Sequence, residues 1–137
     1  MGVEMQLSSH PQFKARLTHG PSGTQIQTEA PKDNGGTGGS FSPTDLVGAA
    51  LASCAVTTMA LAASRENVPW GEVSAKVEKM MTPPPRRIGQ LVVEITMPRE
   101  LPASQRARFE QIGRECPVAR SLHPDVQVPM TFRYPEP

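Results

Sequence analysis

The feature that most restricts the fold of this chain is an uncharged run of 19 residues, Leu46 to Ser64, which contains Cys54. A run of this length can cross a bilayer as a helix. However, seven of its 19 residues are Ala and two each are Ser and Thr, so the run is only weakly hydrophobic. A helix that is apolar on all sides is also typical of the core of a soluble protein. We therefore expect a buried helix and no membrane partner.

Clear signals mark the start of this helix. Ser42 is a suitable N-cap, Pro43 suits the first helical position, and Asp45 follows at the spacing of a capping box. The preceding segment, "APKDNGGTGGS", has four glycines in five positions and cannot hold regular structure cheaply. The sequence therefore predicts a flexible loop that leads into a helix starting at Pro43.

Alternating apolar residues predict strands on both sides of the helix. Three short strands are expected in the first third, around residues 3–7, 13–17 and 24–28. After the helix, the pattern predicts a hairpin over residues 73–77 and 91–97, an amphipathic helix over 103–113 and a last strand over 126–134. The order of strands, helix, hairpin, helix and strand indicates an α+β fold, and 137 residues fit a single domain, 1–137.

Composition excludes several classes of function. The net charge is +1 and no dense basic run is present, which argues against nucleic acid as a partner. The first apolar residues alternate with polar ones, as in a strand, so we expect no signal peptide and a cytoplasmic location. Cys54 and Cys116 lie 62 positions apart and are too few for a disulfide scaffold. In a reducing compartment such a pair is redox-active, metal-binding or merely buried.

Neither a metal, nor a nucleotide cofactor, nor a nucleophilic serine is expected. His10, His19 and His123 show no close pairing, and the interval from Cys116 to His123 is not that of a zinc finger. The glycine-rich loop lacks the Lys-Ser/Thr pair of a P-loop. Ser42 has no histidine partner at a recognisable spacing, and its role as an N-cap accounts for it.

The two cysteines stand in different sequence contexts. Taken alone, Cys54 in an apolar helix is typical of a buried, inert thiol. Cys116 precedes Pro117, so its thiol stands at a helix start, where free N–H groups and the helix dipole favour a thiolate. Neither context alone decides between packing and chemistry.

Together, the two cysteine segments resemble the motifs of a known family. The segment "SPTDLVGAALASC" looks like the first motif of the OsmC/Ohr proteins, and "CPVARSL" is similar to the second. The resemblance covers nearly the whole chain, because the flanking strands and the hairpin also agree with that family. It implies antiparallel sheets packed around a long central Ala-rich helix, and an intertwined homodimer. It also implies a thiol peroxidase that reduces organic or inorganic hydroperoxides in oxidative stress defence.

By this resemblance, Cys54 is the peroxidatic thiol, which attacks the O–O bond of the hydroperoxide and becomes a sulfenic acid. Cys116 then resolves the sulfenic acid as a disulfide within the chain, and an external dithiol reductant restores both thiols. The family resemblance implies no cofactor for this cycle.

The chemistry requires a thiolate, and Cys54 lies about three turns into its helix, too far from the N-terminus for much help from the dipole. In the family, an arginine from the N-terminal strands supplies the positive charge. Arg16 is the only arginine before the helix and is the best match to it. Arg65 and Arg120 are the next candidates.

Asp45 is the candidate for the carboxylate that holds this arginine. The family branch that prefers organic peroxides has a glutamate ten residues before the cysteine, where this chain has Thr44, followed by Asp45. Nine residues at roughly 100° and about 1.5 Å each place Asp45 on the opposite side of the helix from Cys54, about 13 Å away. If Asp45 belongs to the site, it therefore serves Cys54 of the partner subunit. A purely capping role is the alternative.

An alternative hypothesis is that the protein is not an enzyme. In it, the protein is a binding module of the same fold, or a redox-sensing protein with structural cysteines. The threonine in place of the family glutamate, and the absence of an arginine from a glycine-rich first hairpin, favour this reading. Consumption of peroxide by the reduced protein distinguishes the two.

Overall fold

The computed structural model describes residues 1–136, which contain both helices and sheets, so the predicted α+β class is confirmed. The chain forms two compact units that divide between Leu46 and Val47, and each is described by itself. The assignment of residues 1–137 to a single domain stays a prediction.

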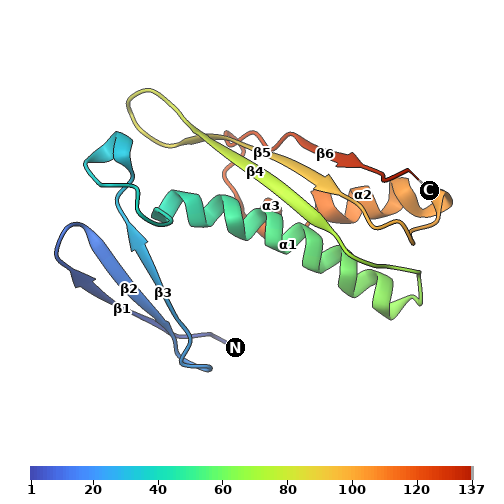
Figure 1. Cartoon of the computed structure of the whole chain (residues 1–137), viewed down its shortest axis with the longest axis horizontal. Coiled ribbons are helices and arrows are strands. Elements are labelled where there is room, and N and C mark those ends of the chain that lie inside the picture. Colours follow the sequence, from blue (N-terminus) through green and yellow to red (C-terminus); the bar gives the residue numbers. More distant parts are fainter. Residues whose placement is uncertain (137) are drawn as a thin grey trace. The chain divides into compact units, whose positions relative to one another are not determined.

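The first unit contains a three-stranded antiparallel sheet in the order β1 (Met5–His10), β2 (Lys14–His19) and β3 (Gln25–Glu29) (Figure 1). The three predicted strands are confirmed, each displaced by a few positions toward the C-terminus. Leu7 pairs with Leu17, which pairs with Ile26, so these apolar side chains share one face of the sheet.

A loop with one short 3-10 turn, η1 (Lys32–Asn34), connects this sheet to helix α1 (Pro43–Arg65). The predicted capping box is confirmed: the Asp45 N–H donates to Ser42 Oγ at 3.1 Å, and the Ser42 N–H donates to Asp45 Oδ2 at 2.8 Å. Within the loop, a Cβ atom on Gly36 would lie 1.7 Å from the carbonyl oxygen of Ala30. The close approach of two backbone segments therefore requires glycine at this position.

The second unit contains the rest of α1 and a sheet in the order β4 (Ser74–Met81), β5 (Ile88–Thr96) and β6 (Met130–Arg133). Strands β4 and β5 form the predicted antiparallel hairpin, and β6 pairs with β5 in parallel. Between β5 and β6 lie three short helical segments, η2 (Ala103–Gln105), α2 (Arg106–Arg114) and α3 (Pro117–Ser121).

The last strand is shorter than the predicted range of 126–134. Pro129 interrupts the alternating pattern, and proline has no N–H to donate to a strand ladder. The segment before β6 still contacts β5, because the Leu91 N–H donates to the Gln127 carbonyl at 2.9 Å and the Val93 N–H donates to the Pro129 carbonyl at 2.9 Å. The backbone therefore follows β5 for longer than the regular strand does.

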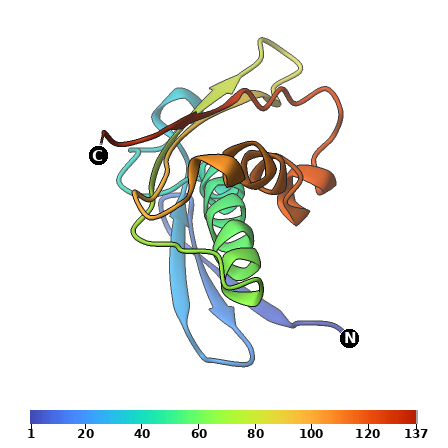
Figure 2. The same cartoon turned by 90° about the vertical axis from the view of Figure 1, so that its right-hand side faces the viewer.

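Helices α1 and α2 pack side by side in the second unit (Figure 2). One stripe of α1 is buried, at positions spaced by three or four residues: Gly48, Leu51, Ala55, Met59 and Ala63. A Cβ atom on Gly113 of α2 would lie 3.2 Å from the sulfur of Met59 and 3.4 Å from the ring of Phe132, so the helices and β6 approach closely there. By length and composition alone α1 could also cross a membrane, a property that it shares with core helices of soluble proteins.

Candidate active site

The structure brings the two cysteines of the chain together within the second unit. Cys54 lies in α1 and is half-buried, whereas Cys116 lies between α2 and α3 and has no exposed surface. Cys54 packs against the buried core cluster that includes Cys116, and it lies close enough to raise the pKa of the Cys116 thiol; both cysteines are free. Two residues 62 positions apart in the sequence thus form one dithiol pair.

Pro117 explains the position of Cys116. A residue before proline is disfavoured in the helical conformation, so α2 must end here. Cys116 accordingly has φ −61° and ψ 157°, and Pro117 starts α3 at its first position. The Cys116 N–H donates to the Gly113 carbonyl at 3.4 Å, and the Cys116 carbonyl accepts from the Arg120 N–H at 3.0 Å. The predicted helix start at Cys116 is confirmed.

The expected thiolate at this helix start is not what the structure favours. Burial raises the pKa of the Cys116 thiol above its ordinary value of 9.0. The backbone N–H groups of Ala119 and Val118 at the start of α3 lower this pKa by less, while the neighbouring Cys54 raises it further. Desolvation therefore outweighs the electrostatic effect of a five-residue helix, and Cys116 is a neutral thiol at neutral pH.

Arg120 holds the turn that carries Cys116. Its guanidinium donates from Nε to the Glu115 carbonyl at 2.8 Å and lies 3.4 Å from a carboxylate oxygen of the same residue. One of the two alternative cations is thus engaged immediately beside Cys116. The other, Arg65, lies in the last turn of α1, about three turns beyond Cys54.

A group of aromatic and charged side chains anchors α2 to the strand β6. The Tyr134 hydroxyl donates to the Glu110 carboxylate, and Arg114 donates to the Met130 carbonyl at 3.2 Å. The guanidinium of Arg106 lies 4.1 Å from the centre of the Tyr134 ring. Burial, with Glu110 as the next cause, raises the pKa of Tyr134, so its hydroxyl stays protonated as a donor. Because α2 leads directly to Cys116, this anchor also fixes the buried thiol.

Sequence reasoning missed one residue beside Cys54. Thr58 Oγ1 lies 3.8 Å from Cys54 Sγ, one helical turn further along α1. The spacing of four residues in an expected helix was the signal that could have found it, because such residues lie on the same face.

The other two predicted site residues lie in the first unit, so their contact with either thiol stays a prediction. Arg16 is exposed in β2, opposite Ser8 and Gln27 in the neighbouring strands. Asp45 forms the capping box described above.

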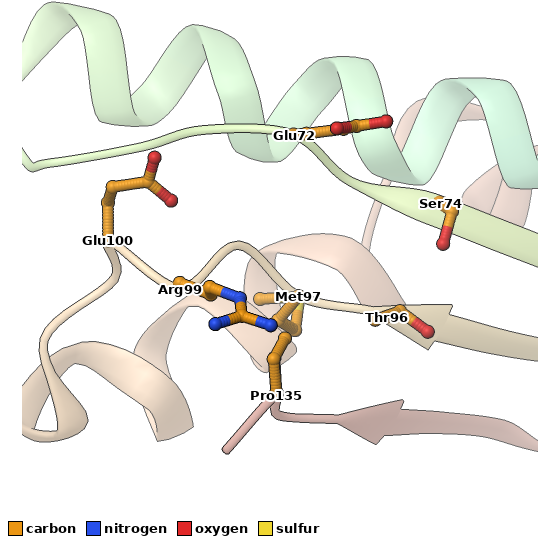
Figure 3. A pocket seen from close by; sticks show the side chains of 7 residues that line it. All are labelled: Glu72, Ser74, Thr96, Met97, Arg99, Glu100 and Pro135. Carbon is orange, nitrogen blue, oxygen red and sulfur yellow. The ribbon is translucent and has the colours of Figure 1, made fainter. Parts of the chain in front are cut away.

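A pocket of about 330 Å³ lies in the second unit (Figure 3). It is lined by residues before and in β4, at the end of β5 and after β6: Glu72, Ser74, Thr96, Met97, Arg99, Glu100 and Pro135. Neither cysteine lines it. Within residues 1–136, no group of three or more His, Cys, Asp or Glu side chains is arranged to hold a metal ion.

The family model for OsmC-like proteins matches residues 36–131 of this chain. Among solved structures, a protein from Psychrobacter arcticus, described as a proposed osmotic stress induced and detoxification response protein, is 32% identical with a TM-score of 0.89. The match covers 97% of this chain and 98% of that one. No curated protein sequence matches significantly.

More distant structures share the fold. An organic hydroperoxide resistance protein OsmC from Legionella pneumophila is 16% identical, with a TM-score of 0.77 over 97% of each chain. The organic hydroperoxide resistance protein OhrB of Bacillus subtilis is 14% identical, with a TM-score of 0.68 over 97% of this chain and 98% of that one. The matched family model includes both cysteine motifs, and the two cysteines meet in the fold. The chain therefore belongs to the OsmC/Ohr family.

Proposed function

We propose that this protein is a thiol peroxidase that reduces hydroperoxides through a disulfide cycle between Cys54 and Cys116. The proximity of the two thiols in one packed cluster carries this proposal, because a sulfenic acid formed on Cys54 would have the second thiol nearby. Membership of the family supports it, and some structural neighbours are named organic hydroperoxide resistance proteins. The difference in burial supports the order of the steps, since half-buried Cys54 is the thiol that a peroxide can reach.

The cycle has three balanced steps. The Cys54 thiolate attacks one peroxide oxygen, an S–O bond forms, the O–O bond breaks, and the alkoxide leaves and takes up a proton. The Cys116 sulfur then attacks the Cys54 sulfenic acid, which forms the disulfide and releases water. An external dithiol supplies two electrons and two protons, which regenerate both thiols and leave the reductant as a disulfide. Such reductants act in the cytoplasm, where we place the protein.

The same proposal includes a homodimer. Outside its buried stripe, α1 keeps uncharged side chains at partly exposed positions, and Leu61 is 47% exposed. In the first unit, Met5 and Leu7 of β1 and Ile26 of β3 are also exposed. Apolar surfaces of this kind favour burial against a second copy of the chain.

The deciding experiment is stoichiometric. Reduced protein is treated with one equivalent of an alkyl hydroperoxide, and the remaining free thiols are counted. We expect both thiols to be consumed, one alcohol to be released per chain, and peptide mapping without reductant to show Cys54 linked to Cys116. Thiols that survive the treatment would support the non-catalytic binding module instead. Loss of both thiols without stoichiometric alcohol would indicate a redox sensor oxidised by another route.

The disulfide-forming step should accelerate with pH. Cys116 attacks as a thiolate, and burial raises the pKa of its thiol, so only a small fraction is ionised at neutral pH. Below that pKa, the thiolate fraction grows about tenfold per pH unit, and the rate of disulfide formation should follow it. Rapid-quench thiol counting after a single addition of peroxide measures this step, with the first oxidation followed separately by sulfenic-acid trapping. A disulfide step that is independent of pH up to about pH 9 would contradict this assignment.

Arg16→Ala should slow the first oxidation of Cys54 at neutral pH by roughly tenfold, if Arg16 stabilises the thiolate of a partner subunit. Arg16→Lys, which keeps the charge, should lose less. The rates are compared between about pH 5 and pH 9. An Arg16→Ala rate equal to wild type over that range would exclude Arg16 as the activating cation.

Asp45 is tested with a pair of substitutions. Asp45→Asn keeps an oxygen for the Ser42 N–H and removes the charge, whereas Asp45→Ala removes both. If Asp45 only caps the helix, Asp45→Ala should cost about 1 kcal/mol of stability, and both variants should oxidise at the wild-type rate. If it also positions Arg16, both variants should slow the first oxidation, by less than Arg16→Ala does.

A further inference from the structure

The environment of the Thr58 hydroxyl is unusual for a threonine in a helix. Helical threonines commonly donate to the carbonyl four residues earlier, which here is that of Cys54. Within the described part of the chain, the Thr58 hydroxyl makes no such bond, and its only hydrogen-bonding partner is Cys54 Sγ, at 3.8 Å. Both side chains are half-buried. The hydroxyl is therefore available to the sulfur rather than committed to the backbone.

We propose that Thr58 is a catalytic residue of the peroxidatic step, in which its hydroxyl donates a hydrogen bond to the Cys54 thiolate. The proposal rests on the proposed function for its catalytic meaning. A hydrogen bond to an ionised acceptor is roughly twice as strong as one to a neutral acceptor, so this contact stabilises the thiolate more than the thiol. The hydroxyl thus favours the form of Cys54 that attacks a peroxide.

Within the second unit, the other groups near Cys54 do little to stabilise a thiolate. Cys54 lies three turns from the start of α1, where the helix dipole contributes little. The adjacent Cys116 thiol is neutral and buried, and an S–H group is only a weak donor. Thr58 is β-branched, so its side chain has few rotamers in a helix and loses little freedom when it faces the sulfur. Thr58 thus provides, within the second unit, a hydroxyl donor for the Cys54 sulfur.

The test measures alkylation of Cys54 by iodoacetamide, because this reaction needs a thiolate but no peroxide. In the full-length reduced protein, peptide mapping reads the modification of Cys54 separately from that of Cys116. Thr58→Val removes the hydroxyl with almost no change in shape, and Thr58→Ser restores it. Thr57→Val is the matched control, because Thr57 is the neighbouring threonine of the same helix and is exposed.

Thr58→Val should lower the alkylation rate at pH 7 by roughly three- to fivefold, because a smaller thiolate fraction is partly offset by the higher nucleophilicity of a more basic sulfur. Its pH–rate profile should move to higher pH and approach or exceed wild type in alkaline solution. Thr58→Ser should recover most of the rate, and Thr57→Val should match wild type. A role confined to helix stability would change the unfolding midpoint and leave the pH profile in place.

The outcomes separate this proposal from the proposed function. A Thr58→Val profile that coincides with wild type overturns the role of Thr58, and so does an equal change in Thr57→Val. Oxidation by an alkyl hydroperoxide is then measured on the same variants and should slow by the same factor. If the wild-type protein is not oxidised by peroxide but Thr58→Val still shifts the alkylation profile, the peroxidase function fails and the stabilisation of the thiolate stands.

Discussion

Cys54→Ser should abolish hydroperoxide turnover, with a loss of at least about a thousandfold, because a serine hydroxyl is not ionised at neutral pH and cannot attack the O–O bond. The substitution removes one sulfur atom from a half-buried position in α1 and leaves the buried stripe of that helix intact. Peroxide consumption and sulfenic-acid trapping measure the loss. The remaining cysteine, Cys116, should stay unmodified, since it has no exposed surface.

Cys116→Ser provides the matched comparison. Here the first oxidation should proceed, but the sulfenic acid on Cys54 has no thiol to resolve it, so turnover stops after one equivalent and over-oxidised Cys54 accumulates. Since Cys116 is fully buried, the new hydroxyl can reduce stability, and Cys116→Ala serves as a second variant without a polar group. Equal rates of initial oxidation in wild type and Cys54→Ser would contradict the assigned roles, and continued turnover in both Cys116 variants would contradict the resolving role.

The parts of the fold that the sequence predicts are those governed by local physics. The capping box at Ser42 and Asp45 and the turn at Cys116 and Pro117 depend on residues within three positions of one another, and the structure confirms both. The β4–β5 hairpin follows from alternation on either side of a proline-rich turn. The last strand was predicted less well. The alternating pattern predicted a strand over residues 126–134, but Pro129 has no N–H to donate, and the regular strand covers only Met130–Arg133.

The properties of the site that depend on burial were not predictable in the same way. A helix start favours a thiolate at Cys116, but the packing around the side chain decides its pKa in the opposite direction. The bond between Tyr134 and Glu110 joins residues 24 positions apart, and no local pattern indicates it. Thr58 was accessible to a helical-spacing argument, since it lies four residues after Cys54. Sequence motifs thus singled out the two cysteines as candidates, while the packing around Cys116 keeps its thiol neutral.

Phe109 packs α2, the helix that leads to Cys116, into the core of the second unit, so its truncation should strongly reduce the stability of the protein. Phe109 of α2 has no exposed surface, and the centres of its ring and that of Trp70 lie 5.3 Å apart. Truncation of a buried phenylalanine to alanine removes both apolar burial and packing contacts around the resulting cavity. Phe109→Ala should therefore lower the free energy of unfolding by about 3–5 kcal/mol.

Arg108→Ala, at the neighbouring position, is the control for this prediction. It removes an ion pair with Glu66 whose side chains are 50% and 42% exposed, and the contact of its guanidinium with the Phe109 ring, 5.5 Å from the ring centre. Exposed interactions of these two kinds contribute about 1 kcal/mol or less each. Denaturant unfolding, followed by the fluorescence of Trp70, compares the stability of the variants with that of wild type. The protein concentration is kept the same in all samples, because association with a second copy would make stability depend on concentration. Since α2 leads directly to Cys116, Phe109→Ala should also slow the formation of the Cys54–Cys116 disulfide, whereas Arg108→Ala should not. A loss of under about 1 kcal/mol in Phe109→Ala would show that α2 is not held by this core contact.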